Sequence, residues 1–204
     1  MTLSKCVLAG ILSLVLFLAV ISPGLTQDKR YYFRHYDVNS GLSQNSVFSI
    51  FQDSQGFMWF GTKYGLNRFD GQRWKNYTTD SKGNPEDILG NDYVHIIHED
   101  QEGILWLGTD EGIYLYNKEL DKFSPFPYQT ENGTVPRLIV SSIAEDQAGN
   151  IWIAGSNQGV FKFDFATKEL TLFSHDPNKA GSIPMGDISS VKVDENNVVW
   201  VSVV

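Results

Sequence analysis

Two histidines three residues apart, His95 and His98, are the first residues of this chain that could bind a metal ion. They lie in a stretch, 93–99, whose composition predicts a strand. Because side chains alternate between the two faces of a strand, residues three apart point to opposite faces and cannot share one ion without distortion. No aspartates follow the spacing of a calcium loop, and no nucleophile lies in a motif with a base. The sequence therefore predicts no catalytic residue, no metal and no cofactor.

Six residues of mixed polarity are better candidates, for recognition of a ligand rather than for catalysis. They form three pairs of chain neighbours: Lys63 and Tyr64, Asp110 and Glu111, and Asn157 and Gln158. An aromatic face beside amides and carboxylates suits a sugar, because the amides and carboxylates supply donors and acceptors for its hydroxyl groups. All six can equally be solvated turn residues, and the sequence leaves both interpretations open.

The elements that position these pairs follow from a repeat. Tryptophan recurs at 59, 106, 152 and 200, with spacings of 47, 46 and 48 residues, and each one follows a near-copy of the same segment. The copies are Asp53-Ser-Gln-Gly56, Asp100-Gln-Glu-Gly103, Asp146-Gln-Ala-Gly149 and Asp194-Glu-Asn-Asn197. A repeat of this period with strand-like flanks is typical of a β-propeller.

The repeated residues have structural roles in this interpretation. Each aspartate caps the backbone amides of a tight turn, and the glycine that follows supplies the positive φ that such a hairpin needs. Asn197 stands in place of the glycine in the fourth copy, and asparagine is the next best residue at positive φ. The tryptophans fill the space between neighbouring blades: Trp59, Trp106, Trp152 and Trp200.

Each repeat reads as a meander of four short strands separated by turn residues. The first gives strands over 46–52, 57–62, 66–70 and 74–78, the second over 93–99, 104–109, 113–117 and 122–125, and the third over 138–145, 151–156, 160–164 and 170–174. The fold class is therefore all-β, a propeller of four-stranded antiparallel blades with three complete blades and partial ones. The repeats span about 44–91, 92–136, 137–186 and 187–204. One extra residue after Trp152 predicts a bulge at Gly155.

The meander also sorts the turns into two rims. Successive turns of an antiparallel sheet alternate between its two ends, so all the Asp-x-x-Gly turns lie on one rim. The turns between the second and third strands lie on the other rim with the connectors between blades. The first set is nearly uniform and suits a scaffold, whereas the second varies and suits recognition. All six candidate residues belong to the second set.

The first 27 residues are predicted to be a signal peptide outside the propeller domain, which spans 28–204. Lys5 precedes a nearly continuous apolar run from Val7 to Ile21, and Ser22-Pro23-Gly24 ends that run. This is how a secretory signal reads, with an uncleaved anchor as the second choice. Cys6 is the only cysteine, so the exported chain contains no thiol. The predicted location is the periplasm.

The segment 31–37 resembles the last strand of a blade and is predicted to close a ring. Its partner strands are then expected beyond Val204, and the chain is expected to be an incomplete, N-terminal part of a longer propeller. The formal charge of −8, with Lys and Arg scattered along the chain, argues against nucleic-acid binding.

The stretch from Gly41-Leu-Ser-Gln-Asn-Ser-Val47 through Asp53-x-x-Gly56-Phe-Met-Trp59-Phe-Gly-Thr62 to Gly71 resembles the repeat of the two-component regulator propeller family. So do the segments that begin at Trp106 and Trp152. The resemblance implies a periplasmic sensor region of seven-bladed propellers, followed by a β-sandwich, a membrane helix and usually a histidine kinase. It also implies an oligosaccharide ligand, control of glycan-use genes and a homodimeric receptor. The kinase motifs themselves do not occur in these residues.

Two other functions stay open at this point. Secreted propeller lyases similar to streptogramin lyase have comparable blades, although their catalysis needs a channel histidine and a metal, and no histidine here recurs at an equivalent place in two repeats. The other alternative is a structural propeller for protein docking. A membrane helix and a kinase downstream would select the sensor.

Overall fold

The computed structural model describes residues 31–79, 89–126 and 138–204. The chain divides into two compact units, 1–35 and 36–204. The first unit is described only over 31–35, where it forms no strand, and the predicted signal peptide lies outside the described residues. The ring-closing role of 31–37 stays a prediction. All the elements below belong to the second unit.

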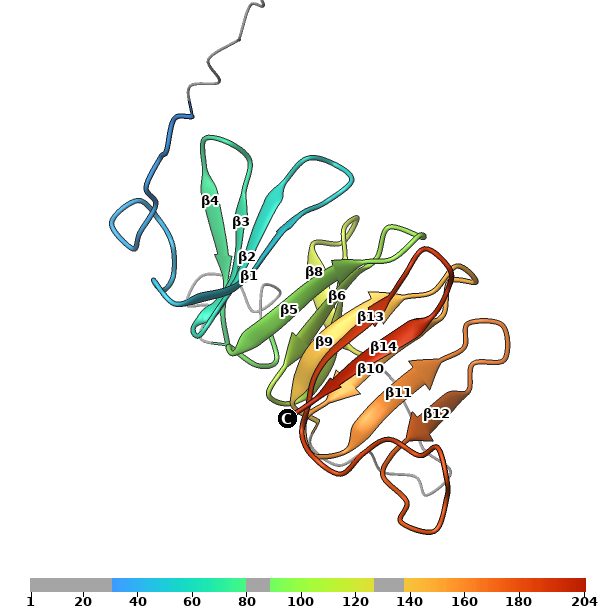
Figure 1. Cartoon of the computed structure of the whole chain (residues 1–204). Coiled ribbons are helices and arrows are strands. Elements are labelled where there is room, and N and C mark those ends of the chain that lie inside the picture. The colour runs from blue at the N-terminus through green and yellow to red at the C-terminus, as the bar shows by residue number, and fades with distance from the viewer. Residues whose placement is uncertain (1–30, 80–88, 127–137) are drawn as a thin grey trace, which may run out of the picture. The chain divides into compact units, whose positions relative to one another are not determined.

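Fourteen strands make up the described part of this unit, in three four-stranded sheets and one two-stranded sheet (Figure 1). Sheet 1 contains β1 (Val47–Gln52), β2 (Met58–Thr62), β3 (Gly65–Phe69) and β4 (Trp74–Tyr77). Sheet 2 contains β5 (Val94–Glu99), β6 (Leu105–Thr109), β7 (Gly112–Asn117) and β8 (Lys122–Pro125). Sheet 3 contains β9 (Val140–Glu145), β10 (Ile151–Gly155), β11 (Gly159–Phe163) and β12 (Leu170–Phe173), and sheet 4 contains β13 (Ile188–Val193) and β14 (Val199–Val203).

The predicted meander is confirmed. Within every sheet the strands are antiparallel neighbours in chain order, and each strand of sheets 1 to 3 lies within two residues of its predicted bounds. The first strands of successive sheets, β1, β5, β9 and β13, contact one another. This places each first strand at the inner edge of a blade, as in a propeller. Among the described residues, no helix is long and apolar enough to cross a membrane.

The repeated aspartate and tryptophan are bonded to each other. One carboxylate oxygen of Asp100 accepts the backbone N–H of Ile104, and the other accepts the indole N–H of Trp106 at 2.7 Å. The remaining three turns repeat the indole bond at 2.7, 3.0 and 2.8 Å. The turn and the core residue are therefore linked. The aspartate carboxylate accepts the hydrogen bond of the indole N–H, which is the polar group of a ring that packs against the blade. The sequence pattern predicts the two roles separately but not this bond.

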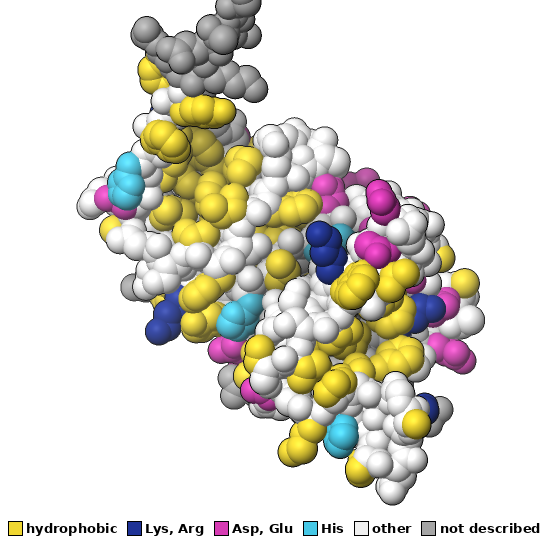
Figure 2. Space-filling view, in the orientation of Figure 1, with side chains coloured by type: hydrophobic (Ala, Val, Ile, Leu, Met, Phe, Trp, Pro, Cys, Tyr) yellow, Lys and Arg dark blue, Asp and Glu magenta, His cyan; other side chains and the backbone are white. Residues whose placement is uncertain are grey.

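The exposed fraction of each repeated tryptophan depends on the size of the sheet that packs against it. Trp59 and Trp106 are each 1% exposed, and each packs in a cluster with residues of the next four-stranded sheet. Trp152 faces the two-stranded sheet 4 and is half-buried. Trp200 is 62% exposed, and no sheet follows it in this chain. Apolar side chains also reach the surface across the face shown in Figure 2. Packing between successive sheets therefore buries the repeated tryptophans.

A bulge interrupts the first strand of every sheet. The pairing with the second strand skips one residue in each case, and the skipped residues are Phe48, His95, Ser141 and Ser189. The register irregularity beside Gly155 belongs to this repeated bulge, so the predicted cause, the extra residue after Trp152, is wrong. That residue instead lengthens the turn between β10 and β11, where Asn157 adopts a φ of 68°.

Two glycines at positive φ give a matched test of this geometry. Gly65 (φ 94°) begins β3, and a Cβ there would lie 2.3 Å from the carbonyl oxygen of Tyr77. Gly71 (φ 97°) lies in the β3–β4 turn, where a Cβ would meet nothing within 4 Å. Both alanine variants carry the conformational cost, but only Gly65→Ala also forces β4 aside. We expect Gly65→Ala to lose at least about 1 kcal/mol more unfolding free energy in urea titrations; equal losses would contradict the fold.

Candidate functional site

The six predicted recognition residues all lie on one rim of the second unit. They occupy the β2–β3, β6–β7 and β10–β11 turns, which lie at the opposite strand ends from the Asp-x-x-Gly turns. Threonines build the two shorter turns: the hydroxyl of Thr62 donates to the carbonyl of Gly65 and accepts the amide of Tyr64. Thr109 repeats the pattern in the β6–β7 turn. We call this edge of the molecule the second rim.

The structure brings two of the six residues together around an aromatic cluster that sequence reasoning missed. The rings of Phe48 and Tyr93 stack at 5.0 Å with an interplanar angle of 20°, and His95 lies 4.5 Å from Tyr93. Asp110 accepts a hydrogen bond from Nε2 of His95 at 2.6 Å, and the ammonium of Lys63 lies 6.0 Å from the Tyr93 ring centre. We call Phe48, Tyr93 and His95 the aromatic cluster.

The aromatic cluster sits where the bulges place it. Phe48 and His95 are the skipped residues of β1 and β5, and their ring centres lie 5.9 Å apart. Phe48 is 47% exposed, although it is a large apolar residue. The period-2 pattern alone assigns these residues to strand faces. The bulge leaves no mark in that pattern, so no signal in the sequence could have found the cluster.

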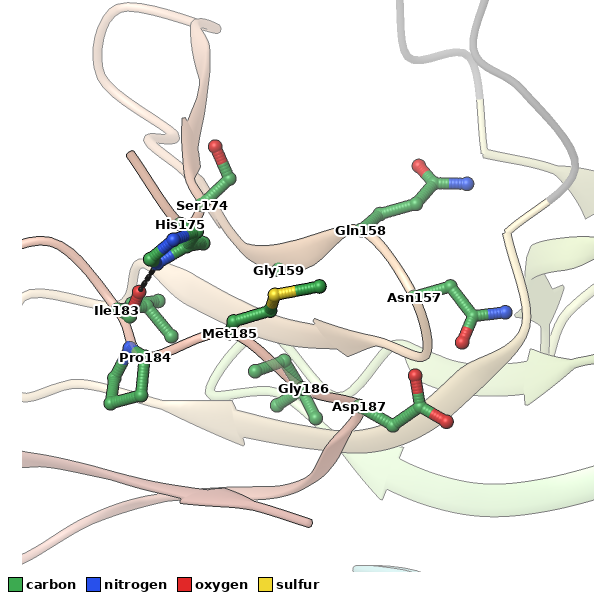
Figure 3. A pocket seen from close by; sticks show the side chains of 11 residues that line it. Asn157, Gln158, Gly159, Ser174, His175, Ile183, Pro184, Met185, Gly186 and Asp187 are labelled. Atoms are coloured by element: carbon green, nitrogen blue, oxygen red, sulfur yellow. Dashed lines mark hydrogen bonds between the residues drawn. The ribbon is translucent and has the colours of Figure 1, made fainter. Parts of the chain in front are cut away.

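Another two of the six residues line a hollow further along the second rim (Figure 3). The hollow has a volume of about 350 Å³ and lies between the β10–β11 turn and the connector to sheet 4. Its lining residues are Asn157, Gln158, Gly159, Ser174, His175, Ile183, Pro184, Met185, Gly186, Asp187 and Ile188. Nδ1 of His175 is 3.0 Å from the carbonyl of Ile183, a contact that joins the two ends of a loop within the connector. Amide, imidazole and carboxylate groups in one hollow suit a polar ligand with several hydroxyl groups.

The remaining two predicted residues, Tyr64 and Glu111, lie in the same turns as Lys63 and Asp110. Tyr64 is 45% exposed beside Lys63 in the β2–β3 turn, and the amide of Glu111 donates to Thr109. The six predicted residues therefore lie on one rim, where two of them contact the aromatic cluster and another two line the hollow.

The two histidines face different carboxylates. His95 pairs with Asp110 on the second rim, whereas Nε2 of His98 is 3.6 Å from the carboxylate of Glu145 on β9. Burial lowers the pKa of His98, against the charges of Asp100 and Glu99. In the described ranges no three His, Cys, Asp or Glu side chains are grouped so that they could hold a metal ion. The two side chains thus contact different carboxylates, although His95 is the skipped residue of β5, where the strict alternation of a regular strand does not apply.

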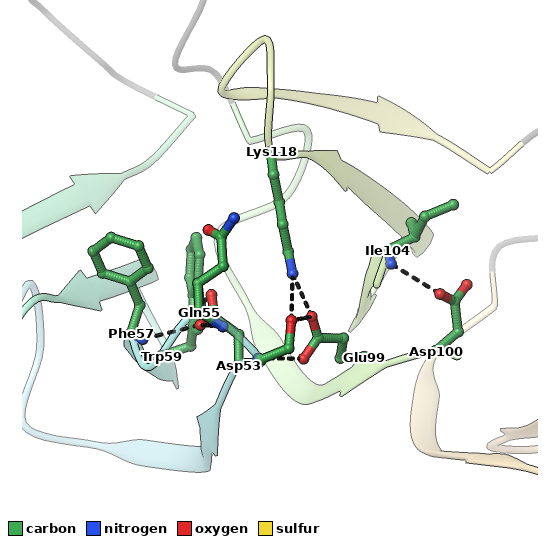
Figure 4. A network of polar contacts seen from close by, with 9 residues as sticks. Asp53, Gln55, Phe57, Trp59, Glu99, Asp100, Ile104 and Lys118 are labelled. Atoms are coloured by element: carbon green, nitrogen blue, oxygen red, sulfur yellow. Dashed lines mark hydrogen bonds and ion pairs between the residues drawn. The ribbon is translucent and has the colours of Figure 1, made fainter. Parts of the chain in front are cut away.

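The opposite rim is occupied by contacts between blades (Figure 4). The amide and hydroxyl of Ser54 both donate to the Glu99 carboxylate at 2.7 Å, and the Lys118 ammonium pairs with the same carboxylate. Burial raises the pKa of Glu99, but the hydrogen bonds from Lys118 and Ser54 outweigh it and lower the pKa. The turn of sheet 1 is thereby tied to the first strand of sheet 2.

The next two turns make the same kind of tie. The amide of Gln101 donates to Glu145 at 3.3 Å, and the amide of Gln147 donates to Asn197 at 2.9 Å. The residue after each of the first three repeated aspartates thus binds the following sheet. Uniform turns on this rim reflect a uniform structural task, while the second rim keeps varied side chains.

The chain is similar to several known proteins. A family model described as two component regulator propeller matches residues 41–64, 88–111 and 134–157. Each match ends within or just past a second-rim turn. The histidine kinase P4 of Formosa agariphila is 40% identical over 78 residues, which are 38% of this chain and 5% of that protein.

Solved structures share the fold. The extracellular domain of a hybrid two component system from B. thetaiotaomicron superposes with a TM-score of 0.72 and 25% identity, over 86% of this chain and 24% of that one. Virginiamycin B lyase from Staphylococcus aureus gives a TM-score of 0.55 and 16% identity, over 79% of this chain and 50% of the lyase. The second likeness shows the propeller fold alone. The chain spans about a quarter of the sensor domain and a small part of the kinase.

Proposed function

This chain carries the repeats of the two-component regulator propeller family, and from that premise we propose that it is the ligand-sensing part of a membrane-anchored two-component sensor. It acts outside the cytoplasmic membrane, in the periplasm, as part of a homodimeric receptor whose kinase lies elsewhere in the longer protein. The extracellular domain from B. thetaiotaomicron, similar over most of this chain, supports this location.

The ligand we propose is an oligosaccharide bound at the second rim, with control of glycan-use genes as the output. The observation that supports this proposal is that the turn residues of the two rims have different roles. On one rim the turn residues make hydrogen bonds between blades. The other rim presents an aromatic cluster and a polar hollow on rigid strands. Binding residues concentrate on varied loops that a rigid scaffold positions.

The experiment is a set of alanine variants in the complete receptor, read out as glycan-dependent expression of a reporter gene. Tyr64→Ala is expected to lower the response at least about fivefold, the equivalent of about 1 kcal/mol of binding free energy. Leu120→Ala is the control, because Leu120 is 64% exposed in the β7–β8 turn on the opposite rim. An undiminished response after replacement of all six predicted residues, one at a time, would sink the proposal.

A propeller used only for protein docking would give a different result. Its reporter output would not respond to any oligosaccharide, and the second-rim variants would behave like the Leu120 control.

A further inference from the structure

The aromatic cluster is not explained by the structural repeat. The tryptophans that support the blades recur in all four repeats, but the cluster does not. The bulge position holds Phe48, His95, Ser141 and Ser189, and the position two residues before it holds Ser46, Tyr93, Ile139 and Asp187. A core role would also predict burial, yet Phe48 is 47% exposed. Stacked rings that neither recur nor become buried are available for a partner.

The surroundings of the cluster indicate what kind of partner. The exposed ring of Phe48 offers a flat apolar face, and the Asp110 carboxylate and Lys63 ammonium flank the stack. A sugar ring combines an apolar face of C–H groups with hydroxyl groups at its edge. The stacked ring can cover the apolar face while the carboxylate accepts and the ammonium donates at the edge. A fully apolar partner would remove solvent from these charged groups without offering them new hydrogen bonds.

The charged groups on the second rim indicate which class of glycan would bind. The β2–β3 and β6–β7 turns hold one ammonium, on Lys63, against the carboxylates of Asp110 and Glu111. Asp187 adds another carboxylate at the hollow on the same rim. A uronate or sulfated glycan would bring its negative charges toward this surplus, and like charges brought together lower affinity.

The geometry points to a stacking subsite for an uncharged sugar residue on Phe48, with Tyr93 and His95 supporting the ring and Asp110 and Lys63 binding its hydroxyl groups. This inference rests on the proposed function, since it names the glycan class and the contact surface. It adds residues that the turn-based prediction does not contain. His95 acts here as a positioning residue, because its hydrogen bond holds the Asp110 carboxylate beside the stack.

The test measures binding of the purified chain to defined hexasaccharides by titration calorimetry. The neutral probes are cellohexaose, xylohexaose, laminarihexaose and maltohexaose, and the charged probes are hexagalacturonate and a chondroitin sulfate hexasaccharide. We expect at least one neutral probe to bind at least about tenfold more tightly than either charged probe. Phe48→Ala should weaken that binding about tenfold, the equivalent of one lost aromatic contact.

Ile50→Ala is the matched control, because Ile50 is an exposed apolar residue two positions further along the same strand and is 64% exposed. Unchanged thermal unfolding of both variants shows that each is folded. Preference for a charged probe, or equal affinity of Phe48→Ala and the wild type, overturns the stacking subsite and leaves a glycan sensor with another contact surface. Absence of binding to all six probes counts against both the subsite and the glycan-sensing function.

Discussion

Replacing Trp106 with alanine lowers the free energy of unfolding by about 3–5 kcal/mol, the cost expected for removing a fully buried tryptophan. The ring is 1% exposed and packs against Phe126 at 4.8 Å and against Phe163 at 6.4 Å. Its removal opens a cavity between sheets 2 and 3. It also leaves Asp100 without the indole N–H that one of its carboxylate oxygens accepts. Urea titration followed by circular dichroism measures the loss.

Trp200→Ala is the matched control for this prediction. Trp200 occupies the same repeat position and bonds the aspartate of its own turn at 2.8 Å, but it is 62% exposed. Its replacement is expected to cost less than about 1 kcal/mol, because little apolar surface returns to water. Similar losses for the two variants would contradict the view that packing between successive sheets carries the stability.

Replacing Asp121 with alanine is expected to have the next largest effect, a loss of about 2–4 kcal/mol. Asp121 lies in the β7–β8 turn and accepts hydrogen bonds from the hydroxyls of Tyr77 and Tyr116 at 2.7 and 2.5 Å. The ammonium of Lys75 is 2.5 Å away, and Arg68 is 3.7 Å away. Tyr77 and Tyr116 are buried, so removing the carboxylate takes away the acceptor of both hydroxyl groups in the interface between sheets 1 and 2, and the hydroxyl of Tyr116 keeps the bond from Nη1 of Arg68 at 2.9 Å.

The same residue makes stability depend on pH in a defined direction. Burial raises the pKa of Asp121, but the hydrogen bonds from Lys75, Tyr116 and Tyr77 outweigh burial and hold the pKa at about 2. The folded pKa is lower than the ordinary aspartate value of 3.8. The contribution of the charge to stability is therefore complete above about pH 5 and is lost as the pH falls through the folded pKa of about 2.

Asp121→Asn isolates this charge, since asparagine keeps the size of the side chain and tolerates the positive φ of 53° at this position. The wild type is expected to exceed the Asn variant by about 1 kcal/mol at pH 7, a value already reduced for solvent screening at a partly exposed group. The difference should shrink as the pH falls below about 5 and be small at pH 2. Asp187→Asn, at an exposed carboxylate in the connector to sheet 4, is the control, with no comparable difference. A gap between wild type and Asp121→Asn that stays constant from pH 7 to pH 2 would contradict the assignment.

The strands and turns of this fold could be predicted because they depend on local signals that occur several times. Period-2 alternation, the Asp-x-x-Gly turns and the spacing of Trp59, Trp106 and Trp152 each repeat, and the repeats support one another. The placement of Lys63, Asp110 and Asn157 on one rim follows from strand alternation alone.

The contacts between blades could not be predicted in this way. Glu99 accepts bonds from Ser54, which is 45 residues away, and Tyr93 meets Phe48 across two sheets. Such contacts depend on how adjacent sheets twist and pack, which local patterns do not encode. The bulge at Phe48 and His95 adds a second reason, because one skipped residue changes the direction of a side chain without changing the sequence pattern.

Amide hydrogen exchange with and without a bound hexasaccharide tests the central claim, that one rim is scaffold and the other is for recognition. The probe is the neutral hexasaccharide that binds the purified chain most tightly in calorimetry. The account predicts slower exchange at 62–65, 93–95 and 109–112 on the second rim, and unchanged exchange at the aspartate turns 53–56, 100–103 and 146–149. Protection concentrated at the aspartate turns, or spread equally over both rims, would contradict it.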